Sequence, residues 1–218
     1  MKGKIKSVLI AGGTHGNEMS GLQAVQNWQS DASELMASAS TYELQFALIN
    51  QQAIARCTRF IDEDLNRQFS HAKLAQTQPN NVPYEVALAA ELNQRFGPKG
   101  ESKTDFIIDI HNTTSNMGAT LIVLESDAFH QQLARHVKSV MPDAVILVED
   151  YQAFEHFAYF CTLGKRGLMI EVGPQPQGTL KAKAYADTLN LTKAVLSFID
   201  LYNKQDIAPL AAVEAYRL

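Results

Sequence analysis

Short, almost continuously apolar segments alternate along this chain with longer segments that have helical periodicity. The apolar segments, which we expect to be strands, are residues 7–11, 44–50, 106–110, 120–124, 145–148 and 168–172. The expected helices are residues 17–28, 84–96, 127–140 and 181–202, and Asp127 is the expected N-cap of the third. Strands covered on both faces lack polar alternation, and strands that alternate with helices form mostly parallel sheets. The pattern therefore predicts an α/β sandwich built on a mostly parallel sheet.

The composition is that of an ordinary globular domain, because 46% of the 218 residues are hydrophobic and 19% are charged. A net charge of −4 without a cluster of Lys or Arg argues against nucleic acid as a partner. No apolar segment approaches the roughly 18 residues that a membrane-spanning helix needs, so no membrane partner is expected. The only cysteines are Cys57 and Cys161, which fits a reducing compartment and makes the cytoplasm the expected location.

We expect one catalytic domain over residues 1–203. A break at residues 203–206 precedes a strand-like segment, residues 211–218. A lone terminal strand either pairs with its own domain or begins another, and we expect residues 204–218 to be a linker and the first strand of a missing C-terminal β domain. Residues 56–83 have no clear periodicity, and a long irregular loop inside a compact domain is usually functional.

His15 and Glu18 follow the first expected strand, directly after the glycine pair at 12 and 13. A His and a Glu three residues apart can direct an imidazole and a carboxylate at one point past a strand end, as a zinc site requires. Taken alone, these two residues are weak evidence for a zinc site. A hydrogen-bonded structural histidine explains His15 about as well, and a carboxylate stabilised by the helix dipole explains Glu18 better.

Two more chemical groups are expected at the same edge of the sheet. His111 follows the strand 106–110, and Glu171 lies at the end of the strand 168–172. The carboxyl ends of parallel strands meet where α/β proteins bind their ligands. A carboxylate at the end of an apolar strand is costly unless it is paired or reactive, so Glu171 is the expected general base. Alternatively, Glu171 is a member of an ordinary ion pair without a catalytic role.

His15, Glu18 and His111 together satisfy the rule of three protein ligands for a catalytic zinc, which leaves a fourth position for water. Asp109 lies two residues before His111 on the same strand and could orient an imidazole from behind. Each histidine alone has a structural explanation, but the joint placement at strand ends favours a metal site. The histidines at 71, 130 and 136 are expected at the surface.

The irregular region supplies Arg59, Asn66 and Arg67. Arg59 could stabilise a developing oxyanion, and Arg67 with Asn66 could hold a substrate carboxylate. Asn112, next to the expected ligand His111, is also assigned to substrate binding. Both arginines could instead belong to a solvated loop that pairs with its own aspartates.

Five segments of the chain resemble aspartoacylase and its close relatives, a group of zinc carboxypeptidase-like amidohydrolases. In chain order they are residues 12–18, 57–62, 64–69, 109–118 and 171–178. The resemblance implies a zinc carboxypeptidase-like fold, which is a three-layer sandwich with a mostly parallel mixed sheet. It also implies one zinc per chain and a role for each matching residue: His15, Glu18 and His111 as zinc ligands, Glu171 for proton transfer, Arg59 to polarise the carbonyl, and Asn66 and Arg67 to hold the substrate.

The implied reaction is hydrolysis of an N-acyl-L-amino acid, typically N-acetyl-L-aspartate to acetate and L-aspartate. The partner is then that small molecule, and a homo-oligomer is possible because the family is often oligomeric. Alternative activities are hydrolysis of N-acyl-aromatic amino acids or succinylglutamate, and a metallocarboxypeptidase. A non-enzymatic alternative is a metal-binding domain with an incomplete site.

The chain departs from the family pattern in two places. Aspartoacylases carry an arginine shortly before the segment that matches residues 171–178. Counted back without gaps, the position of that arginine falls on Cys161 here, with Lys165 and Arg166 nearby. The sequence therefore leaves open whether the preferred substrate carries a charged side chain. The family also has a C-terminal β domain that lends a tyrosine to the site, so weak or no activity is expected without that domain.

Overall fold

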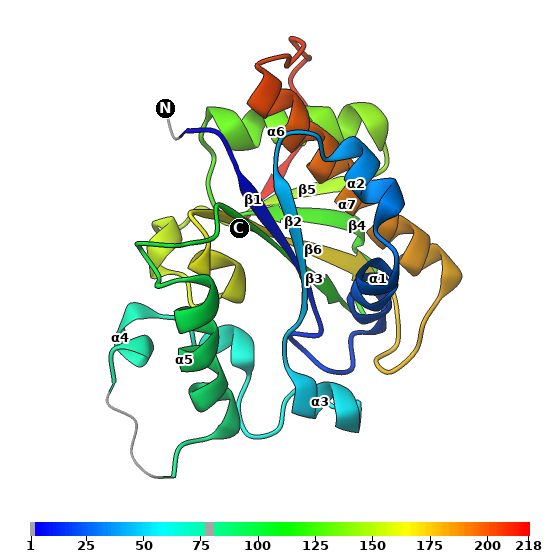
Figure 1. Cartoon of the computed structure of the whole chain (residues 1–218). Coiled ribbons are helices and arrows are strands. Elements are labelled where there is room, and N and C mark those ends of the chain that lie inside the picture. The colour runs from blue at the N-terminus through cyan, green and yellow to red at the C-terminus, as the bar shows by residue number, and fades with distance from the viewer. Residues whose placement is uncertain (1–2, 77–80) are drawn as a thin grey trace.

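The computed structural model describes residues 3–76 and 81–218 (Figure 1). Its centre is a seven-stranded sheet with the order β2-β1-β3-β6-β4-β5-β7. The strands are β1 (Ser7–Gly12), β2 (Glu43–Leu48), β3 (Phe106–Asn112), β4 (Gly118–Val123), β5 (Val145–Val148), β6 (Arg166–Gly173) and β7 (Tyr216–Arg217). The helices are α1 (Met19–Ser30), α2 (Ser33–Ser38), α3 (Gln51–Arg56), α4 (His71–Leu74), α5 (Tyr84–Phe96), α6 (Ala128–Val140) and α7 (Ala182–Lys204), with 3₁₀ turns η1 (Leu65–Arg67), η2 (Phe154–His156) and η3 (Phe160–Leu163).

The sheet is mostly parallel but mixed, as expected. β1 pairs in parallel with β2 and β3, and β3 pairs in parallel with β6. β4 is antiparallel to β6 and parallel to β5, which in turn is parallel to β7. β4, β5 and β7 therefore run against the other strands, and their carboxyl ends lie at the opposite edge of the sheet.

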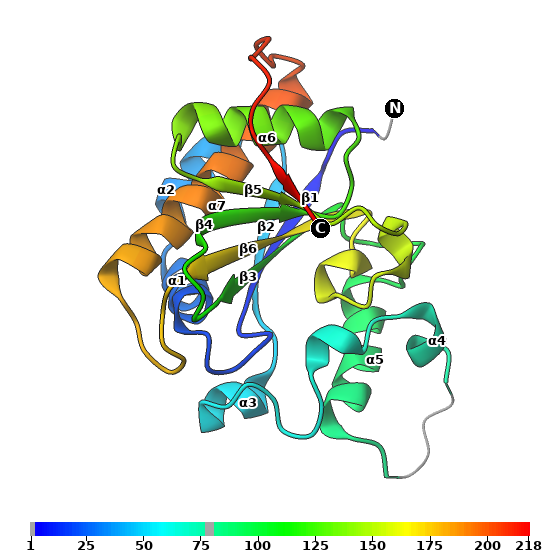
Figure 2. The same ribbon diagram turned by 180° about the vertical axis from the view of Figure 1, so that it is seen from behind.

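Helices cover both faces of the sheet, so the fold is the expected three-layer sandwich (Figures 1 and 2). The larger core joins one face to α1, α6 and α7, and the smaller core joins the other face to α5 and the 3₁₀ turns. Alternate side chains of β3 divide between the two cores, because successive residues of a strand point to opposite faces. Phe106, Ile108 and Ile110 belong to the larger core, and Ile107 belongs to the smaller one. Asp109 and His111 share the face of Ile107.

Near the site, the structure differs from the sequence prediction in the boundaries of two segments. β3 continues to Asn112, so His111 lies inside the strand and not after it. Residues 56–83, expected as one irregular loop, contain η1 and α4. Residues 77–80 of that region lie outside the described part of the chain.

Helix α6 begins as its sequence predicts, because the carboxylate of Asp127 accepts a hydrogen bond from the backbone N–H of His130 at 3.0 Å. The same oxygen lies 2.6 Å from the imidazole Nδ1 of His130. His130 is only 1% exposed, so its expected surface position was wrong. The N-cap carboxylate provides the partner that lets this ring be buried.

The end of the chain lies against the sheet. α7 extends to Lys204, and only Tyr216–Arg217 form a strand, which pairs with β5 at the sheet edge (Figure 2). The backbone N–H of Leu218 also donates to the carbonyl of Val148 at 3.1 Å. In the described residues this segment therefore pairs with the chain's own sheet. No helix in the described ranges combines the length and apolarity needed to cross a membrane.

Candidate metal centre and its pocket

The loop after β1 brings His15 to the edge of the sheet. Gly13 has a φ of +70°, a left-handed conformation that favours glycine. Gly16 packs directly on the backbone of α3, and a Cβ atom there would lie 2.0 Å from the carbonyl carbon of Ala53. The glycines of this motif therefore allow the close approach that carries His15 and Glu18 into the site.

His15, Glu18 and His111 converge on one point. The Nδ1 atom of His15 lies 2.8 Å from one carboxylate oxygen of Glu18, and the Nδ1 atom of His111 lies 2.9 Å from the other. The possible ligand atoms of all three residues lie within 4.8 Å of one another, and all three side chains are buried. The structure thus brings together the three residues that the sequence assigned to a metal.

A carboxylate holds the far nitrogen of each imidazole. The Nε2 atom of His111 lies 2.8 Å from an oxygen of Asp109, and the Nε2 atom of His15 lies 3.0 Å from an oxygen of Asp64. The second oxygen of Asp109 accepts a hydrogen bond from the hydroxyl of Thr14 at 2.7 Å. Histidines that bind metals commonly have this kind of partner behind them, because it fixes the ring and its tautomer.

The electric field of the cluster favours a positive charge. Burial alone would lower the pKa of His111, but Asp109 and Glu18 outweigh it and raise that pKa well above its usual value. Burial would likewise lower the pKa of His15, which Asp64 and Glu18 raise. Two imidazoles and a carboxylate, backed by two further carboxylates, form a donor set that suits a divalent cation such as zinc.

Glu171 stands directly beside this cluster. In the parallel register of β3 and β6 it is the partner of His111, so the two side chains lie on the same face of the sheet. Burial raises the pKa of Glu171 to about 7, although the positive charge of His111 opposes the rise. A carboxyl group with a pKa near neutrality can both accept and donate a proton at physiological pH.

Arg59 reaches the cluster from the segment after α3. Its guanidinium donates to Glu18 at 3.1 Å and to Asp64 at 3.2 Å. The side chain is 43% exposed, so part of it faces the cavity in front of the cluster. Arg59 therefore lies beside the three candidate metal ligands, and its predicted role towards an oxyanion stays a prediction.

Asn66 and Arg67 belong to η1, which the carboxylate of Asp64 caps through the backbone N–H of Asn66 at 2.9 Å. The side-chain oxygen of Asn66 accepts from the backbone N–H of Phe160 at 2.7 Å. Its amide nitrogen lies 3.4 Å from Nε2 of His111. The guanidinium of Arg67 lies over the ring of Tyr159, 5.4 Å from its centroid. Asn66 and Arg67, two of the three predicted substrate-binding residues, both line the cavity in front of the cluster.

Asn112 is held differently from the other predicted substrate residues. Its side-chain oxygen accepts from the backbone of Ser20 at 2.8 Å and from Gln175 at 3.1 Å, and its amide donates to the carbonyl of Val172 at 3.2 Å. Its backbone N–H donates to Glu18 at 3.0 Å. Asn112 lines the cavity, but its observed bonds orient Glu18 and the neighbouring strand.

The predicted site residues all line one cavity of about 550 Å³: His15, Glu18, Arg59, Asn66, Arg67, His111, Asn112 and Glu171. Its wall also contains residues that were not predicted from the sequence, among them Tyr159, Glu149 and Met117. Asp64, which holds His15 and Arg59, was not predicted either. A signal existed for Asp64, because it is the first residue of the segment of family resemblance at 64–69. None existed for Glu149, since it follows a strand whose carboxyl end lies at the opposite edge.

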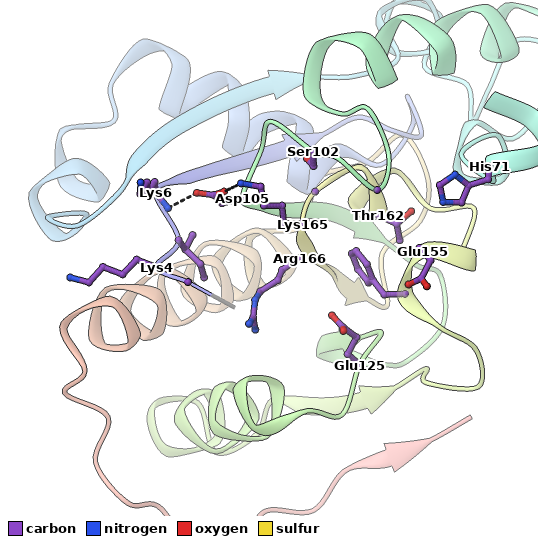
Figure 3. Close-up of a pocket in the computed structure, with 15 residues that line it drawn as sticks. Lys4, Lys6, His71, Ser102, Asp105, Glu125, Glu155, Thr162, Lys165 and Arg166 are labelled. Carbon is purple, nitrogen blue, oxygen red and sulfur yellow. Dashed lines mark hydrogen bonds and ion pairs between the residues drawn. The ribbon is translucent and has the colours of Figure 1, made fainter. Parts of the chain in front are cut away.

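A larger cavity of about 800 Å³ lies elsewhere, where β1, β3 and β6 begin (Figure 3). It contains none of the predicted site residues. Its lining mixes basic and acidic groups. Asp105 accepts hydrogen bonds from the backbone of Lys6 at 2.7 Å and from the side chain of Lys165 at 2.6 Å. The larger of the two cavities is therefore not the one that holds the candidate metal ligands.

Comparisons with known proteins agree with the geometry. The family described as "Succinylglutamate desuccinylase/Aspartoacylase catalytic domain" matches residues 4–199. An N-acyl-aromatic-L-amino acid amidohydrolase of Xenopus laevis is 38% identical over 100% of this chain and 72% of the relative. An aspartoacylase of Danio rerio is 39% identical over 98% of this chain and 68% of the relative.

The fold is shared with a crystal structure of murine aminoacylase 3, with a TM-score of 0.84 and 33% identity over 94% of this chain and 67% of that one. A succinylglutamate desuccinylase from Chromobacterium violaceum shares the fold with a TM-score of 0.67 at 19% identity. The family match covers most of the chain, and relatives at nearly 40% identity span it almost completely. The chain therefore belongs to the succinylglutamate desuccinylase/aspartoacylase family of catalytic domains.

Proposed function

We propose that this protein hydrolyses the amide bond of N-acyl-L-amino acids and that it uses one zinc ion per chain. N-acetyl-L-aspartate, cleaved to acetate and L-aspartate, is the reference substrate that the family resemblance suggests. The observation that carries the proposal is the register of β3 and β6, which sets Glu171 beside His111 and its cluster. A proton-transferring carboxylate next to a buried His–Glu–His set is the arrangement that metal-assisted hydrolysis needs.

In this proposal His15, Glu18 and His111 hold the metal. When bound, zinc supplies a Lewis acid that polarises a carbonyl group and makes water more acidic. The carboxylates of Asp109 and Asp64 keep both Nδ1 atoms turned toward Glu18. The ligand set is thus oriented before any substrate arrives.

Glu171 accepts a proton from the attacking water and delivers it to the nitrogen of the leaving amine. Its raised pKa, about 7, suits both transfers. Arg59 offers a positive charge to the carbonyl oxygen as negative charge develops there. Arg67 and Asn66, which lie side by side on η1, hold the carboxylate of the amino acid.

The family match to residues 4–199 supports residues 1–203 as the catalytic domain. Two cysteines that form no disulfide with each other support a cytoplasmic location. Cys57 is exposed and Cys161 is buried, so they lie in different environments.

The test is a hydrolysis panel on the zinc-loaded protein, combined with metal analysis. The panel contains N-acetyl-L-aspartate, N-acetyl-L-tyrosine, N-succinyl-L-glutamate and a short peptide. We expect release of an amino acid from at least one N-acyl compound and about one zinc per chain. Release of C-terminal residues from the peptide alone would favour a metallocarboxypeptidase. Bound zinc without any turnover would favour a metal-binding domain, and purified protein that takes up no zinc contradicts the proposal.

A further inference from the structure

Residues 157–162, here called the 157–162 turn, pack against both side chains assigned to the substrate carboxylate. The backbone N–H of Phe160 donates to the side-chain oxygen of Asn66 at 2.7 Å. The ring of Tyr159 lies under the guanidinium of Arg67, with 5.4 Å between the guanidinium carbon and the ring centroid. The conformation of this turn therefore affects where Asn66 and Arg67 can lie.

The hydrogen bond from Phe160 also determines which end of the Asn66 amide is offered to a ligand. Because the amide oxygen is the acceptor of that bond, the amide nitrogen points the other way, 3.4 Å from Nε2 of His111 in the cavity wall. A carboxylate only accepts hydrogen bonds and therefore needs donors. The 157–162 turn thus presents the donor end of Asn66 on the cavity side.

A buried lysine holds the 157–162 turn. Lys99 follows helix α5, and it is only 8% exposed. Its ammonium donates to the carbonyl of Phe157 and to the hydroxyl of Thr162, both at 2.5 Å. That hydroxyl donates in turn to the carbonyl of Tyr159 at 2.7 Å. Lys99 is not among the described residues that line the candidate cavity, so it contacts the turn from outside the site.

The burial of this ammonium group requires a physical reason, because removing an ammonium from water costs free energy. In the described parts of the chain, the hydrogen bonds of the Lys99 ammonium go to two neutral oxygens and to no carboxylate. Hydrogen bonds from a charged donor are roughly twice as strong as those between neutral groups. The two oxygens belong to the first and last residues of the 157–162 turn. Lys99 therefore joins the two ends of the turn through strong bonds.

We propose that Lys99 is a positioning residue: by joining the two ends of the 157–162 turn, it holds Asn66 and Arg67 ready for the α-carboxylate of an N-acyl amino acid. The inference rests on the proposed amide hydrolysis and adds to it a residue outside the cavity. Lys99 acts on the substrate only through the turn, by way of the backbone of Phe160 and the ring of Tyr159.

The first test compares Lys99→Met with the wild type on the best substrate of the hydrolysis panel. The assay is run near pH 7, below the pKa of Lys99 of about 8, so that the wild type carries the ammonium. Methionine keeps a long apolar side chain and removes both donated bonds. We expect KM to rise about 3-fold to 10-fold while kcat stays within about twofold, because a contact to the carboxylate is shared by ground state and transition state.

The zinc content should stay at about one per chain in this variant, because Lys99 does not contact the metal cluster. Lys103→Met, the same substitution at an exposed residue nearby, is the control and should change neither KM nor kcat. An unchanged KM in Lys99→Met overturns the inference. So does a fall in kcat as large as the rise in KM, since that result indicates a general loss of site structure.

A double-mutant cycle with Arg67→Ala distinguishes positioning from a general loosening of the fold. If Lys99 acts by holding Arg67 and Asn66, Lys99→Met should lose most of its effect on KM once Arg67 is already alanine. The effect should also be lost for a substrate whose α-carboxylate is replaced by an amide. An increase in KM by the same factor in both backgrounds, or for both substrates, overturns the inference.

Binding measurements separate this inference from the proposed function. Calorimetric titration of N-acetyl-L-tyrosine and N-acetyl-L-aspartate into Glu171→Gln, with and without Lys99→Met, needs no turnover. If the wild type hydrolyses neither compound but Lys99→Met still weakens binding, the proposed hydrolysis fails and the positioning role stands. Equal binding in the two proteins overturns the positioning role even if hydrolysis is observed. Binding of neither compound to Glu171→Gln overturns it as well.

A second variant keeps the test decisive if circular dichroism shows that Lys99→Met does not fold. Thr162→Val removes the hydroxyl that accepts from Lys99 and preserves the shape of the side chain. It should also raise KM and weaken binding, without a matching fall in kcat. Wild-type values of KM and affinity in a folded Thr162→Val variant would overturn the inference.

Discussion

His111 and Glu171 are register partners on the neighbouring parallel strands β3 and β6. The hydrogen-bond ladder of the sheet therefore fixes the separation between an expected metal ligand and the expected proton-transfer group. A site built on strands keeps its geometry better than one built on loops, because the backbone on both sides is paired. Glu18 and His15 come from the loop after β1. Glu18 is held by the imidazole of His111 and the backbone N–H of Asn112 on β3, and His15 is held by Glu18 and Asp64.

Glu171→Gln should retain the metal and lose turnover. The amide preserves the shape of the side chain but cannot take a proton, so we expect kcat to fall by about 100-fold or more. Steady-state kinetics on the best substrate of the panel, with zinc content measured on the same sample, checks this. Turnover at the wild-type rate would remove Glu171 from the mechanism.

His111→Ala should abolish stoichiometric zinc binding. The substitution removes one of three buried ligands and leaves Glu18 and Asp109 without their shared partner. Elemental analysis after dialysis should show about one zinc in the wild type and much less in the variant. His71→Ala is the matched control, because His71 is exposed on α4 and should not change the zinc content. Equal zinc in all three proteins would rule out the assigned ligands.

Arg67→Ala should raise KM more than it lowers kcat. Arg67 is assigned to the α-carboxylate of the substrate, a contact present in both the ground state and the transition state. Loss of one charge-assisted hydrogen-bond pair corresponds to an increase in KM of about 10-fold to 100-fold. Arg56→Ala, at the exposed end of α3, provides the comparison. A fall in kcat with unchanged KM would instead place Arg67 in the chemical step.

Gly16→Ala should destabilise the protein and weaken its zinc binding. The added Cβ atom would lie 2.0 Å from a backbone carbon of Ala53, so the loop or α3 must move. Overpacking of this kind costs about 1–3 kcal/mol. Gly3→Ala is the control, since no atom lies within 4 Å of its added Cβ. Denaturant titrations measure the free energy of unfolding of each protein. Equal free energies for Gly16→Ala and the wild type would show that the loop relieves this contact without cost.

Lys99 should make the stability of the protein depend on pH under alkaline conditions. Burial lowers the pKa of Lys99 from 10.5 to about 8, although its ammonium donates to the carbonyl of Phe157 and the hydroxyl of Thr162, both at 2.5 Å. Between these two pKa values the unfolded chain holds the proton and the folded chain does not. The free energy of unfolding should therefore rise with pH in that window, by at most about 3 kcal/mol.

The test variant is Lys99→Met, which has no proton to release at this position. Its free energy of unfolding should therefore not rise with pH in that window. Lys103→Met, at the surface, should keep the rise. Urea titrations from pH 7 to pH 10.5 on the three proteins measure the slope. A slope that is the same in wild type and Lys99→Met would show that Lys99 keeps its proton throughout.

The sequence by itself determined the architecture and most of the candidate site. The apolar segments predicted β1 to β6 because buried strands need side chains that are apolar on both faces. His15, Glu18 and His111 were predictable because strand ends in a parallel sheet share one edge. The N-cap Asp127 was predictable because its role depends on the residues that directly follow it.

Only the tertiary structure decided which distant groups complete the site. Asp64 meets His15 across 49 residues of sequence, and Tyr159 joins Arg67 to Glu149 through loop packing that no local pattern encodes. The antiparallel pairing of β4 with β6 reverses β5 and so brings Glu149 to the cavity. Strand direction and register depend on the free energy of the whole sheet, and for that reason the charge of the pocket could not be predicted from the segments alone.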